Sequence, residues 1–305
     1  MAEVSVSPFG GEADDLRTVR DLLRFAVSRF REAELFFGHG FTDARHEAGY
    51  LIGWALHLPH ATFDDWLDAR LTATERERVL TLIEQRITTR KPAAYLTGEA
   101  WLGEFRFTVD ERVLIPRSFI ADLLGDQFAP WVREPDDVES ALDLCTGSGC
   151  LAVLLANAFS NAHVDAADLS DDALAVARGN VDDHGLGDRI ELLKSDLFDA
   201  LASRRYDVIV SNPPYVDAPS MAALPAEYRH EPALGLAAGN DGLDLVHRLL
   251  RDAHRHLTPS GILVVEIGHN RDALEAACPD IAFTWLDTPA GDEYVFLLER
   301  EQLAG

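Results

Sequence analysis

The first third of the chain shows the spacing of amphipathic helices. Apolar side chains recur every third or fourth position in residues 16–30, 48–56 and 79–87, which places them on one face of a helix. Thr42 and Thr74 stand where a hydroxyl can cap the second and third helices, and Pro92 stands where the third would end. The pattern predicts an N-terminal helical domain over residues 1–90, in which we see no catalytic constellation.

A different periodicity follows. Residues 104–110 alternate polar and apolar side chains, which is typical of a strand, and Gly98 and Gly103 mark turns beside it. We expect residues 91–120 to form a β-hairpin that links two domains.

From about residue 140, strand-like and helix-like segments alternate. Short apolar runs occupy residues 141–145, 164–167, 190–193, 206–210, 262–267, 282–286 and 294–298. Helical segments separate the first five, at residues 151–159, 172–182, 197–202 and 243–256. This alternation predicts an α/β domain over residues 121–305, with a mostly parallel sheet, helices on both faces and a final antiparallel hairpin at the sheet edge.

Candidate ligand-binding residues follow four strands in order. The first strand runs into a glycine loop, residues 143–149, while Asp168 and Asp196 follow the second and third strands. Glycines let the backbone approach a ligand, and ligands of open α/β sheets bind beyond the carboxyl ends of the strands. Either aspartate alone is more simply explained as a helix or turn cap, but the ordered set favours a binding site.

The glycine loop departs from a dinucleotide-binding fingerprint. Cys145 stands where G-x-G-x-x-G would have its first glycine, no third glycine opens the helix, and no G-x-x-x-x-G-K-[ST] motif occurs. These departures favour a nucleoside ligand without phosphates.

The fourth strand is followed by Asn212, Pro213, Pro214 and Tyr215, the most specific feature of the sequence. Two prolines fix the backbone and hold Asn212 extended, because a residue before proline avoids the α region. The loop would present the Asn212 amide oxygen and nearby carbonyls as acceptors for a planar NH2 group, and Tyr215 would offer an aromatic face to a cation. An ordinary Pro-Pro turn is the alternative.

Charge and cysteine content narrow the function classes. The chain carries 52 acidic and 27 basic residues, for a net charge of −25, which disfavours stable nucleic-acid binding and suits a basic protein partner. Three cysteines cannot form a disulfide framework, so a reducing cytoplasm fits best. We expect no signal peptide in residues 1–11, no membrane span, and no metal site at Cys145 and Cys150.

The glycine loop, Asp168, Asp196 and the tetrapeptide resemble class I S-adenosylmethionine-dependent amino-methyltransferases. Residues 109–118 (V-D-E-R-V-L-I-P-R-S) resemble the corresponding stretch of the HemK-type protein-glutamine methyltransferases. The resemblance to this family covers nearly the whole chain. The resemblance implies a Rossmann-like seven-stranded sheet preceded by a helical substrate-recognition domain and a hairpin linker. It also implies S-adenosyl-L-methionine as the cofactor.

Site roles follow from the same resemblance. Asp143, Thr146 and Gly147 would line the methionine and ribose side of the cofactor, in a loop that also includes Gly149. Asp168 would hold the ribose, Asp196 would reach the adenine amino group, and Arg117 would shape the cofactor mouth. Asn212 and the Pro213 carbonyl would grip a glutamine amide, with Pro214 and Tyr215 completing the substrate contact and Tyr215 near the transferring methyl group.

Residues 95–101, 143–150, 227–232 and 283–286 resemble the PrmB branch of this family. That branch methylates a glutamine of large-subunit ribosomal protein uL3, whereas the sister branch methylates the Gly-Gly-Gln glutamine of release factors. The release-factor activity of the sister branch is the first alternative, and a DNA adenine methyltransferase and a non-catalytic ribosome-assembly module are two less favoured ones. The acidic charge argues against the DNA methyltransferase, and the intact tetrapeptide argues against the assembly module.

Overall fold

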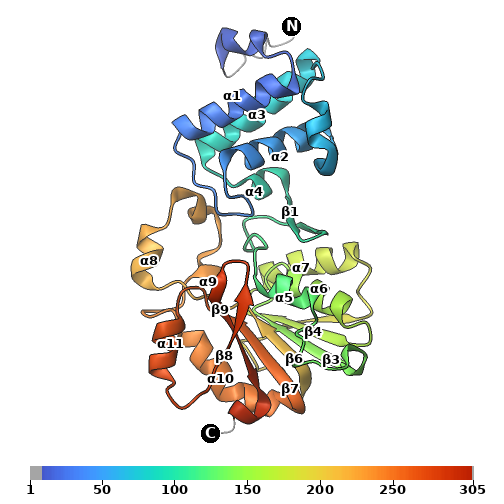
Figure 1. Cartoon of the computed structure of the whole chain (residues 1–305), viewed down its shortest axis with the longest axis vertical. Helices are drawn as coiled ribbons and strands as arrows, with labels where there is room; N and C mark the ends of the chain where they lie inside the picture. Colours follow the sequence, from blue (N-terminus) through green and yellow to red (C-terminus); the bar gives the residue numbers. More distant parts are fainter. Residues whose placement is uncertain (1–8, 304–305) are drawn as a thin grey trace. The chain divides into compact units, whose positions relative to one another are not determined.

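The structure is a computed structural model that describes residues 9–303, with the side chain of Glu12 excluded (Figure 1). Residues 1–8, where most of the signal-peptide expectation falls, lie outside this range. The chain divides into two compact units. The first contains Met1–Glu99 and Pro225–His230, and the second contains Ala100–Leu224 and Glu231–Gly305.

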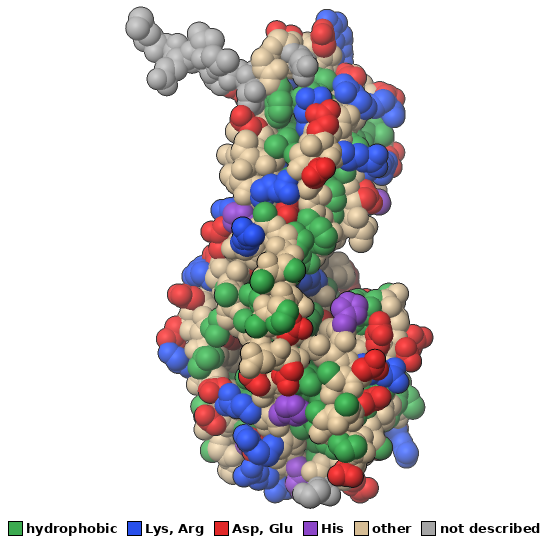
Figure 2. Space-filling model, turned by 90° about the vertical axis from the view of Figure 1, so that its left-hand side faces the viewer, with side chains coloured by type: hydrophobic (Ala, Val, Ile, Leu, Met, Phe, Trp, Pro, Cys, Tyr) green, Lys and Arg blue, Asp and Glu red, His purple; other side chains and the backbone are tan. Residues whose placement is uncertain are grey.

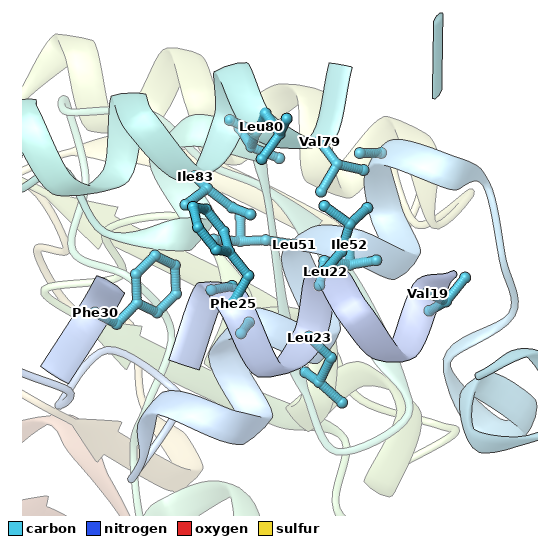
Figure 3. Close-up of a cluster of buried hydrophobic side chains, with 14 of the residues drawn as sticks. Val19, Leu22, Leu23, Phe25, Phe30, Leu51, Ile52, Val79, Leu80 and Ile83 are labelled. Atoms are coloured by element: carbon cyan, nitrogen blue, oxygen red, sulfur yellow. The ribbon is translucent and has the colours of Figure 1, made fainter. Parts of the chain in front are cut away.

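Three long helices form the first unit, together with shorter ones. Its helices are η1 (Gly10–Asp15), α1 (Val19–Glu32), α2 (Ala44–Leu56), η2 (His60–Trp66), α3 (Ala73–Thr89), α4 (Ala93–Thr97) and η4 (Ala226–His230). Figure 3 shows the apolar faces of α1, α2 and α3 meeting in one core, where Leu22, Ile52 and Ile83 are inaccessible to solvent. The periodicity of the first third therefore predicts these faces correctly.

Two of the predicted caps are wrong by one or two residues. Asp43, not Thr42, caps α2 by accepting hydrogen bonds from the Arg45 and His46 amides. Thr72, not Thr74, caps α3, because a glutamate three positions later completes a reciprocal capping box.

Residues 225–230 join the first unit through buried charges. The Glu227 side chain is fully buried, and its Oε1 lies 3.1 Å from Arg90 Nε and 3.6 Å from Arg86 Nη1. Arg86 is itself buried and contacts Glu47 Oε1 at 2.5 Å. His230 adds a contact between its Nε2 and the Thr89 carbonyl at 2.9 Å. This short segment, which we call the inserted segment, is thus held by the C-terminal end of α3 and by the loop that follows α1.

The second unit contains a seven-stranded sheet in the order β5-β4-β3-β6-β7-β9-β8. Its strands are β3 (Ser140–Leu144), β4 (His163–Asp168), β5 (Ile190–Lys194), β6 (Tyr206–Ser211), β7 (Leu257–Glu266), β8 (Thr284–Thr288) and β9 (Gly291–Glu299). The first five are parallel, while β9 pairs antiparallel with both β7 and β8. The predicted parallel sheet with a final hairpin at its edge is confirmed. A separate two-stranded ribbon, β1 (Glu99–Leu102) and β2 (Phe105–Thr108), matches the expected hairpin.

Helices cover both faces of this sheet (Figure 1). On one face, α10 (Asp244–His256) and α11 (Arg271–Ala277) bury their apolar sides against alternate strand residues such as Leu142, Ile209 and Leu263. The intervening strand residues point the other way, toward α5 (Ile120–Gly125), α6 (Cys150–Ala158) and α7 (Asp171–Asp183). Short elements complete the unit: η3 (Pro135–Asp137), α8 (Ala218–Ala223), α9 (Ala233–Leu236) and η5 (Arg300–Leu303).

The helix predicted at residues 197–202 is wrong. The segment forms consecutive turns, with Leu197 and Ala202 in the left-handed region at φ 51° and 45°. The Ser195 hydroxyl donates to the Leu197 carbonyl and accepts from the Ala200 amide, so a side chain supplies bonds that a helix would make internally.

Candidate active site

A pocket lies where β3, β4, β5 and β6 end, entirely within the second unit. Six segments line it: the stretch before α5, the loops after β3, β4 and β5, the loop after β6 with α9, and the start of the helix at Asp244–His256, α10. Backbone bonds align these strand ends, because the Thr146 amide donates to Ala167 and the Ser195 amide donates to Asp168. The four candidate segments of the sequence therefore meet in one place, as the sheet topology requires.

The loop after β3 approaches the pocket through unusual backbone geometry. Cys145 adopts φ 62°, Gly147 adopts φ 55° and Gly149 adopts φ 80°. Gly149 does not line the pocket but begins α6, where an added Cβ would lie 3.1 Å from Ala177 Cβ. The lack of a side chain at Gly149 thus lets α6 pack closely on α7.

Two aspartates, Asp143 and Asp168, hold this loop through hydrogen bonds. Asp143 is inaccessible to solvent and does not line the pocket; its Oδ2 accepts from Thr146 Oγ1 at 2.5 Å. Burial raises the pKa of the Asp143 carboxyl to about 7. Asp168 does line the pocket, and its carboxylate accepts from the Gly147 and Ser170 amides at 2.9 Å each. Burial also raises the pKa of Asp168 above its ordinary value.

These bonds within the turn do not prevent Asp168 from acting in a binding site as well. Each carboxylate oxygen has two lone pairs, so each can accept a further hydrogen bond. Asp196 also lines the pocket, with its Oδ1 2.9 Å from Arg248 Nη2.

The loop after β6 brings the whole tetrapeptide, Asn212 to Tyr215, to the same pocket. The Tyr215 ring packs on Gly268, where an added Cβ would lie 2.6 Å from the ring. The Tyr215 carbonyl accepts from Asn270 Nδ2 at 2.9 Å. Glycine and asparagine residues that follow β7 in the chain thus fix the aromatic ring beside the pocket.

The stretch of residues 112–118, which we call the pocket wall, faces these loops. Arg117 lines the pocket, but its guanidinium forms a two-pronged pair with Glu231, at 2.5 and 2.7 Å. Glu266 accepts from Ser118 Oγ at 2.7 Å and from the Phe119 amide at 2.9 Å, and burial raises its pKa to about 6.

Sequence reasoning missed three residues that shape the site. Asn180 links the loop after β3 to the hairpin, since its side chain bonds the Ser148 carbonyl and both backbone groups of Thr108. Glu231 and Glu266 hold the pocket wall from positions more than a hundred residues away. Two signals stand in the sequence: Glu266 is a polar residue within an apolar run, and Glu231 lies in the stretch of residues 227–232 that resembles one branch of the family.

The pocket suits a nucleoside with a cationic group better than a phosphate. Carboxylates line it at two strand ends, and its arginines, Arg112 and Arg117, are each paired with a carboxylate. Burial raises the pKa of the Cys150 thiol to about 12 and that of Cys145 further, so neither is a thiolate nucleophile.

Two other features are absent from residues 9–303. No group of three His, Cys, Asp or Glu side chains there is placed to hold a metal ion. No helix in the same range is long and apolar enough to span a membrane.

Comparisons with known proteins agree with this geometry. The methyltransferase small domain family matches residues 130–224, and the PrmC N-terminal domain family matches residues 21–98. Among solved structures, the hMettl16 catalytic domain in complex with MAT2A 3′UTR hairpin 1 superposes with a TM-score of 0.51. It is 18% identical and covers 83% of this chain and 90% of that chain. This likeness concerns the fold alone, and the predicted class I methyltransferase architecture is confirmed.

Full-length relatives are much more similar. A ribosomal protein uL3 glutamine methyltransferase of Neisseria meningitidis serogroup A is 57% identical and covers 97% of this chain and 98% of that protein. The protein of the same name from Bordetella pertussis is 58% identical, with 95% and 97% covered. The chain is therefore an enzyme, and it belongs to the family of ribosomal protein uL3 glutamine methyltransferases.

Proposed function

We propose that the enzyme transfers a methyl group from S-adenosyl-L-methionine to the side-chain amide nitrogen of a glutamine in ribosomal protein uL3. One observation carries this proposal: the tetrapeptide Asn212–Tyr215 lines the same pocket as the loop after β3, Asp168 at the end of β4 and Asp196 after β5. A site for an NH2 group and a site for a nucleoside are thereby next to each other.

Asp168, Asp196, Thr146 and Gly147 are the residues that would hold the cofactor. Asp168 accepts hydrogen bonds from the ribose hydroxyls on its remaining lone pairs, and Asp196 accepts a hydrogen bond from the adenine amino group. Asp143 acts indirectly, by holding Thr146 and hence the loop after β3. Arg117 acts on the cofactor mouth through its pair with Glu231. When bound, S-adenosyl-L-methionine supplies an electrophilic methyl group on a sulfonium sulfur.

Asn212 and the Pro213 carbonyl act on the acceptor amide. Each accepts one hydrogen of the NH2 group, which orients the nitrogen and favours its pyramidal, nucleophilic form. Orientation of this kind is worth roughly 7–11 kcal/mol in well-aligned reactions. Tyr215, fixed by Gly268 and Asn270, closes the site beside the transferring methyl group. The proton lost from nitrogen passes to solvent, so no strong general base is required.

The choice of acceptor rests on the relatives and on charge. The relatives that match this chain over its length are named for uL3. A net charge of −25 favours a free, basic ribosomal protein over one whose charge ribosomal RNA already neutralises. We therefore propose cytoplasmic action on free or early-assembled uL3, with no stable nucleic-acid binding and no membrane attachment.

A methyl-transfer assay with labelled cofactor tests the proposal. Purified enzyme is offered free uL3, a release factor, duplex DNA and mature ribosomes in parallel, and mass spectrometry identifies the modified residue. We expect label on a uL3 glutamine, with less on mature ribosomes. Label on the release factor alone would assign the sister activity, label on DNA would assign an adenine methyltransferase, and no transfer at all would favour the assembly module.

A further inference from the structure

The pocket wall is held by the buried carboxylate of Glu231, a residue that follows the tetrapeptide in the chain. Glu231 has a fully buried side chain, and its Oε1 accepts from the Ile115 amide at 3.0 Å. Both oxygens accept from the Arg117 guanidinium, which also donates to the Ile115 carbonyl at 3.1 Å. One carboxylate therefore fixes both the backbone and a side chain of the pocket wall.

The chain continues from Glu231 directly into α9, and α9 is bonded to the residue after the tetrapeptide. The Val216 amide donates to the Leu236 carbonyl at 2.9 Å, and the Ala238 amide donates to the Val216 carbonyl at 3.0 Å. Gly235 packs on Leu114 of the pocket wall, where an added Cβ would lie 3.0 Å from Leu114 Cγ. A continuous path of bonded and packed groups thus runs from the pocket wall through Glu231 and α9 to the tetrapeptide.

We propose that Glu231 is a positioning residue that couples the cofactor side of the pocket to the acceptor side. It fixes the distance between the pocket wall and Asn212–Tyr215 through the pair with Arg117. This proposal rests on the proposed function, in which the two sides hold cofactor and glutamine. It assigns Arg117 a role through Glu231 rather than a direct bond to the cofactor.

The chemistry of the pair explains why two residues are needed. A buried carboxylate is costly unless a cation and hydrogen bonds compensate it, and removing one partner leaves the other uncompensated. Arginine offers a planar fork that bonds both oxygens, which lysine cannot reproduce. Displacement of the wall by even about 1 Å would misalign the reacting groups and lower the rate by roughly a hundredfold.

Hydrogen exchange tests the coupling without any acceptor. Glu231→Gln keeps the size of the side chain but removes its charge, and Arg117→Lys keeps the charge but loses the fork. We expect Glu231→Gln to lose amide protection at residues 113–118 and also at residues 216–218 and 233–238. Loss confined to residues 113–118 would overturn the coupling, because the wall would then move alone.

Binding and turnover give a second, separable readout. For Glu231→Gln we expect the Kd for S-adenosyl-L-methionine, measured by calorimetry, to rise about tenfold. At saturating cofactor, kcat with uL3 should fall at least about tenfold. Arg117→Lys should raise Kd and lower kcat by smaller factors. The double variant that combines Glu231→Gln with Arg117→Gln should have the same Kd and kcat as Glu231→Gln alone. An unchanged kcat at saturating cofactor, or multiplicative effects in the double variant, would overturn the proposal.

A matched control separates positioning from general stability. Asp207 accepts hydrogen bonds from Ser140 and Thr258 at the opposite end of the sheet, so Asp207→Asn should lower Tm while leaving Kd and kcat unchanged. Equal losses of kcat in this control would overturn the positioning role. If Glu231→Gln does not fold, Arg117→Lys carries the same tests at a half-buried position. If the unchanged enzyme fails to methylate uL3, the proposed function fails, while the exchange pattern still decides the coupling.

Discussion

Asp143 lies beneath the loop after β3, where its carboxyl group has one hydrogen-bond partner for Oδ2, and Oδ1 is buried without one among the described residues. Its pKa of about 7 exceeds that of an aspartate in the unfolded chain, so folding takes up a proton. The protonated Asp143 carboxyl group contributes its full stabilisation of the folded state below about pH 4, where the folded and unfolded states are both protonated. This contribution to the free energy of unfolding is lost as pH rises through 7.

We therefore expect the free energy of unfolding to fall with rising pH more steeply in the unchanged enzyme than in Asp143→Asn. The difference in slope should approach about 1.4 kcal/mol per pH unit between about pH 4 and 7. Urea unfolding of both proteins from about pH 5 to about pH 8 measures it. Asp217→Asn, which removes an exposed capping carboxylate whose pKa is lowered by Ser220, should show no such difference in that range. Parallel curves for Asp143→Asn would contradict the prediction.

Asn212 is the residue on which the proposed chemistry depends most directly. Asn212→Ala removes an acceptor for the substrate NH2 group without altering the loops that would hold the nucleoside. We expect cofactor affinity within about threefold of the unchanged enzyme and turnover lowered by roughly a hundredfold or more. Calorimetry and a labelled methyl-transfer assay measure the two quantities. Asn161→Ala, an exposed change far along the chain from the site, is the control; retained full turnover in Asn212→Ala would refute the mechanism.

Gly268 makes room for the Tyr215 ring and adopts φ 57°. Gly268→Ala should displace the ring and lower kcat by about tenfold or more, because the site beside the methyl group loses its wall. Gly185→Ala supplies a matched control, since Gly185 has a similar φ of 67° but nothing lies within 4 Å of its added Cβ. Both variants carry backbone strain of about 1 kcal/mol, so a fall in kcat shared by both would show that strain, not Tyr215, is responsible.

At the scale of single residues, the sequence predicts the place of those site residues that lie at the ends of strands or directly after them. Thr146, Asp168, Asp196 and the tetrapeptide all line the pocket, because parallel strands end at one edge. Asp143 lies in β3 and Gly149 begins α6, so they flank the loop that contains Thr146 and do not line the pocket. Glu231 and Asn180 act through contacts between distant parts of the chain, which no local pattern reveals.

At the scale of elements, the periodicity of apolar residues predicts the positions of strands and long helices well, but it does not predict the residue at which a helix begins. Thr72 and Thr74 are equally good caps by residue type, and each is followed three positions later by a glutamate, Glu75 or Glu77. The T-x-x-E signature therefore does not choose between them; in the structure the Glu75 carboxylate reaches back to Thr72. The turns at residues 197–202 carry apolar side chains into the core, so their composition resembles a helix while side-chain bonds from Ser195 prevent one.

The inserted segment, residues 225–230, depends on one buried carboxylate. Glu227→Ala leaves Arg86, which is inaccessible to solvent, with a single acidic partner, Glu47. We expect the first unit to lose about 3 kcal/mol or more of stability, since breaking a buried pair leaves an uncompensated charge. Hydrogen exchange of α3 measures this loss, with Glu77→Ala, an exposed change in the same helix, as control. Unchanged protection of α3 would contradict the prediction.

For the whole molecule, the acid excess is uneven along the chain. Residues 1–99 contain 16 acidic and 12 basic side chains, whereas residues 100–305 contain 36 and 15. Acidic and basic side chains are interspersed on the face of the molecule drawn in Figure 2. Attraction of a basic substrate is therefore expected to arise mainly from the second unit.

We expect kcat/KM for free uL3 to fall roughly tenfold as salt rises from about 0.05 to about 0.3 M, because screening weakens charge attraction. Reaction with a short uncharged glutamine peptide should change little and serves as the control. Steady-state kinetics at several salt concentrations measure both. Equal salt dependence for peptide and protein would show that the charge of uL3 is not responsible.

The inserted segment also has a consequence for anyone who divides or recombines this protein. A fragment ending at residue 99 contains Arg86 and Arg90 but lacks Glu227, so the buried Arg86 keeps only Glu47 as an acidic partner. A chimaera that exchanges the N-terminal unit between relatives must therefore transplant residues 225–230 as well. The gene carries this unit in two separate pieces, and a single crossover cannot move it intact.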